Sequence, residues 1–365
     1  MNNGTLRRAT GAVLVGAALT TSAGALATTL YTQTNDASAN DVQIYETGPD
    51  GALALSGQVS TGGLGTGGGL GNQGALALSG NRRWLFAVNA GSDDISAFAV
   101  TPHGLVLVDR VPAGGSKPVS VTTHGDALYA LDAGGTGNIA GFRIQANGHL
   151  TSIDGSSRPL SSPAAGAAQV GFSPEGETLV VTEKATSRLS TYTLDDDRLR
   201  GPFVSPSVGM TPFGFAFDLR GDLIVSEAVG GKPGAATVSS YDVNDDSGAL
   251  SVVSASVPTN QSAACWIALA RHGRFAYATN TGSGTVTGYA VSRAGELTPL
   301  SADGITGYTG GGPTDAASSR AGTTMYVLSP SIGQIVAFHV EADGRLARIG
   351  STAGVPATAT GLVVR

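Results

Sequence analysis

A short hydrophobic pattern recurs seven times along the chain. Each copy begins with Leu or a β-branched residue and ends with an aromatic residue three positions later. The aromatic positions are Tyr45, Phe98, Phe142, Tyr192, Tyr241, Tyr289 and Phe338, which follow one another at steps of 53, 44, 50, 49, 48 and 49 residues. A period of this length built from short strands is typical of the four-stranded blade of a β-propeller.

Each copy lies in the same frame of strands and turns. An apolar run precedes it, as at residues 85–88 and 179–181, and a Gly-x-Leu turn follows it, as at Asn147-Gly148-His149-Leu150. A further Gly turn precedes the apolar run, for example at Gly176. Because Gly and Asn supply the positive φ angles of tight hairpins, the frame predicts four antiparallel strands per repeat. We call these strands A to D, from the central channel outwards.

The two ends of the chain complete the count of blades. Residues 361–365 match an A strand, and residues 28–31 match a B strand that no A strand precedes. One blade is therefore expected to take strand A from the C-terminus and strands B, C and D from the N-terminal part, which removes an unpaired edge. The sequence predicts an all-β, seven-bladed propeller in one domain that spans residues 28–365.

The first 27 residues resemble an export signal. Arg7 and Arg8 precede a small-residue apolar run at 12–27, and Ala25-Leu26-Ala27 has the A-x-A form of a signal-peptidase site. The run is too short and too rich in Ala, Gly and Thr for a membrane anchor. We expect cleavage after Ala27 and a secreted or extracytoplasmic protein without a stable membrane anchor, while the Sec and twin-Arg routes both stay open.

Composition narrows the class of protein further. The 365 residues include 54 Gly and a single Cys, 13% are charged, and the net charge is −6. A chain with 41% hydrophobic residues and little charge is not disordered. One Cys excludes a disulfide framework within the chain and thiolate-cluster metal sites. The basic residues form no stripe, so no nucleic-acid partner is expected. We further expect the protein to be a monomer and to bind a small molecule.

Candidate chemistry gathers in the B–C and D–A loops, which share one face of a propeller. The three lysines of the chain, Lys117, Lys184 and Lys232, all fall in these loops, whereas none of the five His does. A Ser-His-Asp triad is therefore not expected at this face. We predict that Glu227 or Glu183, at the ends of B strands, acts as general base. Lys184 is predicted to stabilise an oxyanion.

Further polar and aromatic residues of the same face are candidates for ligand binding. They are Lys117, Gln169, Gln73, Asn89, Phe213, Gln261, Trp266, Asn280 and Asp315. We predict no metal site and no cofactor. A hard cation such as calcium or magnesium, held by oxygen atoms of Glu183, Glu227, Asn280 and Asp315, stays an open alternative.

The repeated motifs resemble those of a known family. Asn89-Ala90-Gly91-Ser92, Asn280-Thr281-Gly282-Ser283 and the Gly-x-Leu turns are similar to the blades of lactonase-type seven-bladed propellers, the family of 6-phosphogluconolactonase and carboxymuconate cyclases. The resemblance covers residues 28–365, and the chain looks similar to secreted members of the family. It implies the propeller fold and activity on a lactone or sugar-acid ring.

The sequence departs from that family at two A strands. Where relatives carry Pro-His-x-His, this chain has residues 164–169 without His, and where they carry Arg-His it has Thr211-Pro212-Phe213-Gly214. A Glu after the following B strand is retained as Glu227. Loss of the basic partners argues against a sugar phosphate as substrate.

Three functions remain open, and catalysis is favoured among them. The first is an exported lactonase-like propeller that hydrolyses or isomerises a small lactone or sugar-acid ring. The second is a non-catalytic extracellular propeller that binds a ligand or a protein. The third, weaker alternative is a metal-dependent hydrolase.

Overall fold

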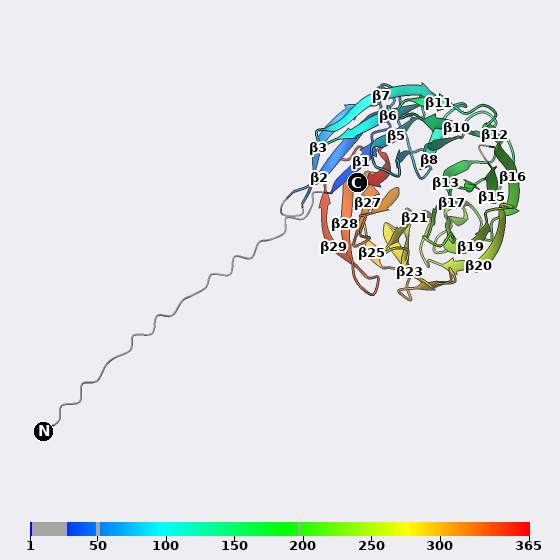
Figure 1. Cartoon of the computed structure of the whole chain (residues 1–365). Coiled ribbons are helices and arrows are strands. Elements are labelled where there is room, and N and C mark those ends of the chain that lie inside the picture. Colours follow the sequence, from blue (N-terminus) through cyan, green and yellow to red (C-terminus); the bar gives the residue numbers. More distant parts are fainter. Residues whose placement is uncertain (2–27, 49–51, 196–197) are drawn as a thin grey trace.

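Seven β-sheets surround a central channel in the computed structural model of the chain (Figure 1). The structure describes residue 1 and residues 28–48, 52–195 and 198–365. The predicted export signal therefore lies almost wholly outside the described residues. Each sheet contains four antiparallel strands, or five where the outermost strand is interrupted, and in six of the seven sheets the strands are consecutive in the chain. The predicted all-β, seven-bladed propeller is confirmed.

We number the blades along the chain from the first complete one. Blade 1 contains β4 (Leu76–Leu78), β5 (Trp84–Asn89), β6 (Asp94–Thr101) and β7 (Gly104–Pro112); blade 2 contains β8 (Pro118–His124), β9 (Ala127–Asp132), β10 (Asn138–Ile144), β11 (Leu150–Ser152) and β12 (Arg158–Pro159); blade 3 contains β13 (Ala167–Phe172), β14 (Thr178–Glu183), β15 (Arg188–Asp195) and β16 (Arg198–Pro206). Blade 4 contains β17 (Pro212–Phe217), β18 (Leu223–Glu227), β19 (Thr237–Asn244) and β20 (Ala249–Pro258); blade 5 contains β21 (Ala264–Ala270), β22 (Phe275–Asn280), β23 (Thr285–Val291), β24 (Leu297–Pro299) and β25 (Gly307–Tyr308); blade 6 contains β26 (Asp315–Ser318), β27 (Thr324–Ser329), β28 (Gln334–Val340) and β29 (Leu346–Thr352).

Blade 7 is built from both ends of the chain. Its strand order is β3 (Leu53–Ser60), β2 (Asp41–Thr47), β1 (Thr29–Gln33) and β30 (Thr360–Val364). Leu30 pairs with Val364 in this sheet, as the terminal strands predicted. The blue and red ends of the ribbon consequently lie side by side in Figure 1.

The repeated aromatic residues of the C strands fill the space between blades. Each of the seven is at most 2% exposed, so each contributes about 2 kcal/mol or more of hydrophobic burial. Some also join neighbouring blades through their hydroxyl groups. Tyr192 of blade 3 donates to the carbonyl of Pro159 in blade 2 over 2.8 Å. Tyr241 of blade 4 accepts the amide of Val208 over 2.9 Å.

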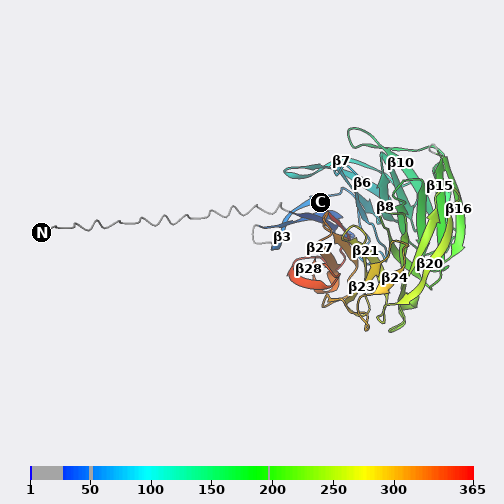
Figure 2. The ribbon, with the colours of Figure 1, turned by 60° about the horizontal axis from the view of Figure 1, so that its bottom comes forward.

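The outer D strands are protected against pairing with other chains. In each of the five uninterrupted D strands the pairing with strand C contains a shift of register. Such bulges twist an edge strand and hinder edge-to-edge association. Figure 2 shows β16 and β20 at the rim of the ring from the side. Helical structure in the described ranges is limited to two 3₁₀ turns, Val229–Gly231 and Pro330–Ile332, so none of it can cross a membrane.

Candidate functional site

The D–A loop that leads from blade 7 to blade 1 enters the channel at the loop-rich face. Its residues 71–74, which we call the plug, contact the A strands of blades on the opposite side. Gln73 donates from Nε2 to the carbonyl of Ile267 over 3.0 Å and accepts the amide of the same residue over 3.2 Å. Its backbone amide donates to the carbonyl of Ala168 over 3.2 Å. Gln73 was expected to bind a ligand, but both ends of its amide are engaged within the protein.

Asn72 fixes the plug to three further strands. Its Nδ2 donates to the carbonyl of Val119 in blade 2, and its carbonyl accepts Nε1 of Trp266 in blade 5. Its Oδ1 accepts the hydroxyl of Thr360 in blade 7 over 3.1 Å. Because Asn72 and Gln73 together reach blades 2, 3, 5 and 7, the plug ties the ring together at this end of the channel.

Lys184 lies beside the plug at the mouth of the channel. It follows β14, is partly exposed, and donates from Nζ to the carbonyl of Gly71. The same Nζ lies 4.7 Å from the ring centre of Phe213, and that ring makes an edge contact with Trp266 at 5.3 Å. Within the part of the chain that the structure describes, no carboxylate forms an ion pair with Lys184. Lys184, Phe213 and Trp266, which the sequence analysis assigned to one face, are thus in contact in the structure.

The surroundings of Lys184 disfavour its charge. Burial is the main cause that lowers the pKa of Lys184 to about 8, and the positive charge of Lys117 lowers it further. Cys265 lies close enough to act in the opposite direction. Burial raises the pKa of the Cys265 thiol itself to about 11, so this thiol stays protonated at neutral pH. Positive charge at this mouth therefore comes from two side chains, the exposed Lys117 and the half-buried Lys184.

Glu183 and Glu227 are enclosed by hydrogen-bond donors. Both are fully buried at the ends of β14 and β18. The carboxylate of Glu183 accepts the amide and hydroxyl of Ser161 and the hydroxyls of Thr186 and Ser190. The carboxylate of Glu227 accepts from the amide of Gly209 and the hydroxyls of Thr237, Ser239 and Ser256. Each carboxylate fastens a C strand to a D–A loop, and neither presents an oxygen to solvent in this structure.

Asn89 and Asn280 occupy the same position in blades 1 and 5. Asn89 donates to Asp94 and to the hydroxyl of Ser96. Asn280 donates to the hydroxyls of Thr285 and Thr287. Both residues are fully buried. The polar residue at the end of each of these B strands therefore holds the start of the following C strand.

Other predicted ligand residues make bonds within the scaffold. Gln169 exchanges two hydrogen bonds with the backbone of Phe215 in the next A strand, at 2.7 and 3.0 Å. Gln261 donates to the carbonyl of Asp303 over 3.0 Å. Asp315 accepts the amides of Ala316 and Leu362, and burial raises its pKa to about 8. In the described ranges, no group of three or more His, Cys, Asp or Glu could hold a metal ion.

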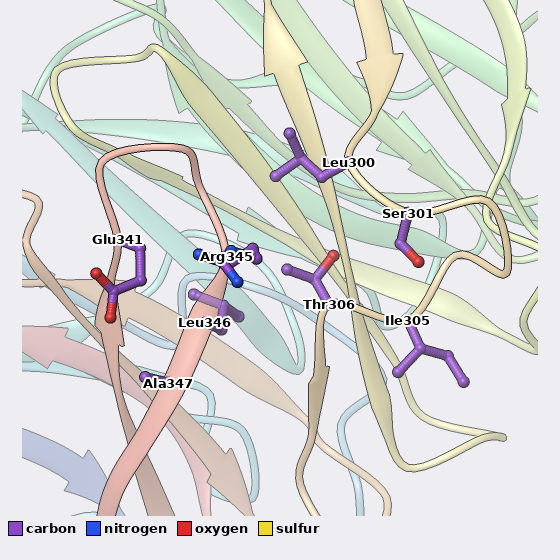
Figure 3. A pocket seen from close by; sticks show the side chains of 8 residues that line it. All are labelled: Leu300, Ser301, Ile305, Thr306, Glu341, Arg345, Leu346 and Ala347. Carbon is purple, nitrogen blue, oxygen red and sulfur yellow. The ribbon is translucent and has the colours of Figure 1, made fainter.

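Two cavities lie away from the loop-rich face. One, of about 400 Å³, is lined by residues of β8, β13 and β17, among them Val121, Phe215 and Phe217, and has Gly74 of the plug at its inner end. The other, of about 370 Å³, lies between blades 5 and 6 (Figure 3). Leu300 and Thr306 line one side of this groove, and Glu341, Arg345 and Leu346 line the other. None of the predicted catalytic residues lines either cavity.

The plug was missed by the sequence analysis. Its partners lie far away in the sequence, and the contact from Gln73 to Ile267 spans 194 positions. One local signal was available at Gly214, where a Cβ would overlap Oε1 of Gln73. A Gly inside an A strand indicates that another segment approaches its backbone closely.

Comparison with known proteins agrees with this architecture. Residues 235–363 match the family model described as "Lactonase, 7-bladed beta-propeller". No curated protein matches the chain significantly. Among solved structures, a candidate 6-phosphogluconolactonase of Bacteroides fragilis has a TM-score of 0.71 at 18% identity, over 95% of this chain and 99% of its own. A periplasmic gluconolactonase of Pseudomonas aeruginosa has a TM-score of 0.72 at 19% identity, over 93% and 99%.

A third similar structure, a candidate 6-phosphogluconolactonase of Bacteroides uniformis, has a TM-score of 0.74 at 16% identity, over 92% of this chain and 99% of its own. At such identities the solved structures show similarity of fold alone, whereas the family model matches the sequence from β19 of blade 4 through blades 5 and 6 into β30 of blade 7. The resemblance predicted from the repeats is confirmed by the match over residues 235–363, and the chain has the fold of a seven-bladed β-propeller similar to these lactonase-type proteins.

Proposed function

We propose that the protein hydrolyses a small lactone or sugar-acid ring at the mouth of the channel, on the loop-rich face. The observation that carries the proposal is Lys184, a half-buried cation that has no carboxylate partner among the described residues and lies near Lys117, in a propeller similar to lactonase-type proteins. A cation held in this way favours a ligand that is anionic or that becomes anionic during the reaction. An extracytoplasmic location accords with the predicted export signal and forms part of the proposal.

The proposed chemistry needs one positive group at the reacting carbonyl. Water adds to the lactone carbonyl carbon and loses one proton to solvent, and the carbonyl oxygen becomes an oxyanion. The ring C–O bond then breaks, the ring oxygen takes up a proton from solvent, and a hydroxy acid results. Lys184 carries three donors, of which the Gly71 carbonyl occupies one. A second donor stabilises the oxyanion and then the product carboxylate. The ammonium form that this role requires predominates below about pH 8.

Glu183 and Glu227 have a different role in this proposal from the one the sequence suggested. A water molecule activated by either carboxylate would first have to displace one of the donors around it. We therefore assign both residues to the positioning of the loops that carry Lys184 and Phe213. Lys117 adds positive charge at the mouth, and Phe213 and Trp266 provide an apolar wall.

The test is a pH-stat assay of the purified protein on a panel of aldonolactones and aliphatic lactones. Lys184→Met keeps the length of the side chain but removes its donors, and we expect kcat/KM to fall by about 10²-fold. Lys232→Met is the matched control, because Lys232 is exposed in the B–C loop of blade 4. Equal rates for the two variants would remove Lys184 from the mechanism.

The alternative function is a non-catalytic binding propeller. Its specific support is the plug, which fills the channel mouth with residues of the chain itself. The absence of turnover on every lactone, measured on folded wild-type protein, would favour this alternative over hydrolysis.

A further inference from the structure

Asp132 lies in blade 2 at the position that Glu183 and Glu227 occupy in blades 3 and 4. It ends the B strand β9 and is fully buried. Among the described residues, the only hydrogen bond to its carboxylate is a long one, 3.4 Å, from Nδ2 of Asn138 to Oδ2. Oδ1 has no partner. Among the described residues, no Lys, Arg or His forms an ion pair with this carboxylate.

The other blades show what is missing around Asp132. In blades 1, 3, 4 and 5 the third residue of the C strand carries a hydroxyl group that bonds to the polar residue at the end of strand B; these residues are Ser96, Ser190, Ser239 and Thr287. In blade 2 the same position is Ala140, which has no donor to offer. The repeat itself therefore identifies Asp132 as the carboxylate that has lost its normal partners.

Residues with oxygen-bearing side chains lie in the loops beside the unpartnered carboxylate. Burial is the main cause that raises the pKa of Asp132 to about 8. The negative charge of nearby Asp93 is the second cause. The hydroxyl of Ser116 lies 3.3 Å from both carboxylate oxygens of Asp93. Gly115 packs so closely that a Cβ there would overlap both Oδ1 of Asn138 and Oδ2 of Asp132. Gly115 thus packs against Asp132 and Asn138, and Ser116, the next residue of the same loop, contacts Asp93.

We propose that Asp132 and Asp93 form a site for a hard divalent cation, with Asn138 and Ser116 as neutral oxygen ligands. Calcium fits this set best, because it accepts mixed carboxylate, amide and hydroxyl oxygens in irregular geometry. Two negative charges match a divalent ion, which would satisfy Oδ1 of Asp132. Asp93 is exposed and gives the ion a path from solvent. The site is distinct from the alternative cation site considered from the sequence, which involved other blades.

The amide of Asn138 has the freedom that such a role needs. Its Nδ2 makes only two contacts, both at 3.4 Å, to the carbonyl of Gly114 and to Asp132. Neither contact is strong, since N–H···O bonds are normally 2.7–3.2 Å long. Rotation of the amide by half a turn would therefore lose little and would direct Oδ1 to the ion.

Thermal unfolding of the full chain, first treated with a chelator, tests the proposal with Ca²⁺ alone as the probe. We expect the unfolding temperature of wild type to rise with Ca²⁺ concentration and to saturate, because an ion that binds only the folded state stabilises it. Asp132→Asn should abolish the rise. Asp93→Asn should shift it to calcium concentrations at least about tenfold higher, because calcium affinity depends on the number of charged ligands.

Asp126→Asn serves as the matched control in the same blade, because Asp126 is exposed and pairs with Arg143 on the opposite face. This variant should keep the full calcium response. A wild-type unfolding temperature that ignores Ca²⁺, or a rise that persists in Asp132→Asn, would overturn the site. Should Asp132→Asn fail to fold, titration calorimetry of Ca²⁺ into wild type and Asp93→Asn decides the question, and the absence of binding heat refutes the proposal.

Discussion

Replacement of Gln73 by Ala would test whether the plug ties the ring together. The side chain of Gln73 makes two hydrogen bonds to the backbone of Ile267, at 3.0 and 3.2 Å. Each such bond contributes about 1 kcal/mol net, so their loss should lower the free energy of unfolding by about 2 kcal/mol. Ile267 is only 1% exposed, and if its backbone groups stay dry the loss should approach about 4 kcal/mol.

Equilibrium unfolding in urea measures this change, and Gln169→Ala provides the matched control. Gln169 makes the same pair of bonds to Phe215, but it joins two neighbouring A strands and does not cross the channel. Both variants should lose a similar amount of stability. Only Gln73→Ala should make the amine of Lys184 more reactive toward an acylating reagent, because the carbonyl of Gly71 then no longer holds it in place. A Gln73→Ala protein within about 0.5 kcal/mol of wild type would refute the assigned contacts.

Two further predictions follow from the buried carboxylates. Glu227→Gln places an NH₂ group against donors such as the amide of Gly209, so unfolding in urea should show a loss of about 1–3 kcal/mol, whereas an unchanged stability would contradict the enclosure of this carboxylate. The pH dependence of thermal unfolding should have two windows. Asp132 and Asp315, each with a pKa raised to about 8, keep protons that the unfolded chain releases near pH 4, so stability should fall as pH rises from about 4 to 8. Lys184, with its pKa lowered to about 8, binds its proton more weakly than the unfolded chain does, so its contribution to stability should rise between about pH 8 and 10.5. In metal-free buffer, Asp132→Asn should reduce the slope of stability against pH in the first window only.

The number of blades was predictable because one position per blade has to be aromatic. The C-strand aromatic residues are buried against the preceding blade, so the period of the sequence follows the period of the fold. The pairing of β1 with β30 was predictable for the same reason, since each end carries a strand that lacks its neighbour. Both inferences use only local strand patterns, which a propeller repeats without change.

The roles of Glu183 and Asn280 could have been predicted as structural from the same repeat. Ser190 follows Glu183 by seven positions, and Thr287 follows Asn280 by seven. That spacing places a hydroxyl group of the C strand beside the residue that ends the B strand. The plug could not be found in this way, because its partner strands lie far away in the sequence and its contacts follow no period.

The proposed cation site and the proposed catalytic residue Lys184 lie on one face of the ring, and Lys117 lies near both. The backbone amide of Lys117 donates to Asp93 over 2.7 Å, which places this residue at the edge of the proposed cation site. The charge of Lys117 also lowers the pKa of Lys184, which places it within reach of the proposed catalytic group. A cation bound by Asp93 and Asp132 would therefore order the loop that carries Lys117 and would add positive charge near Lys184. Because like charges disfavour the ammonium form, the ion would shift the pKa of Lys184 downward and would link metal binding to the protonation state on which the proposed hydrolysis depends.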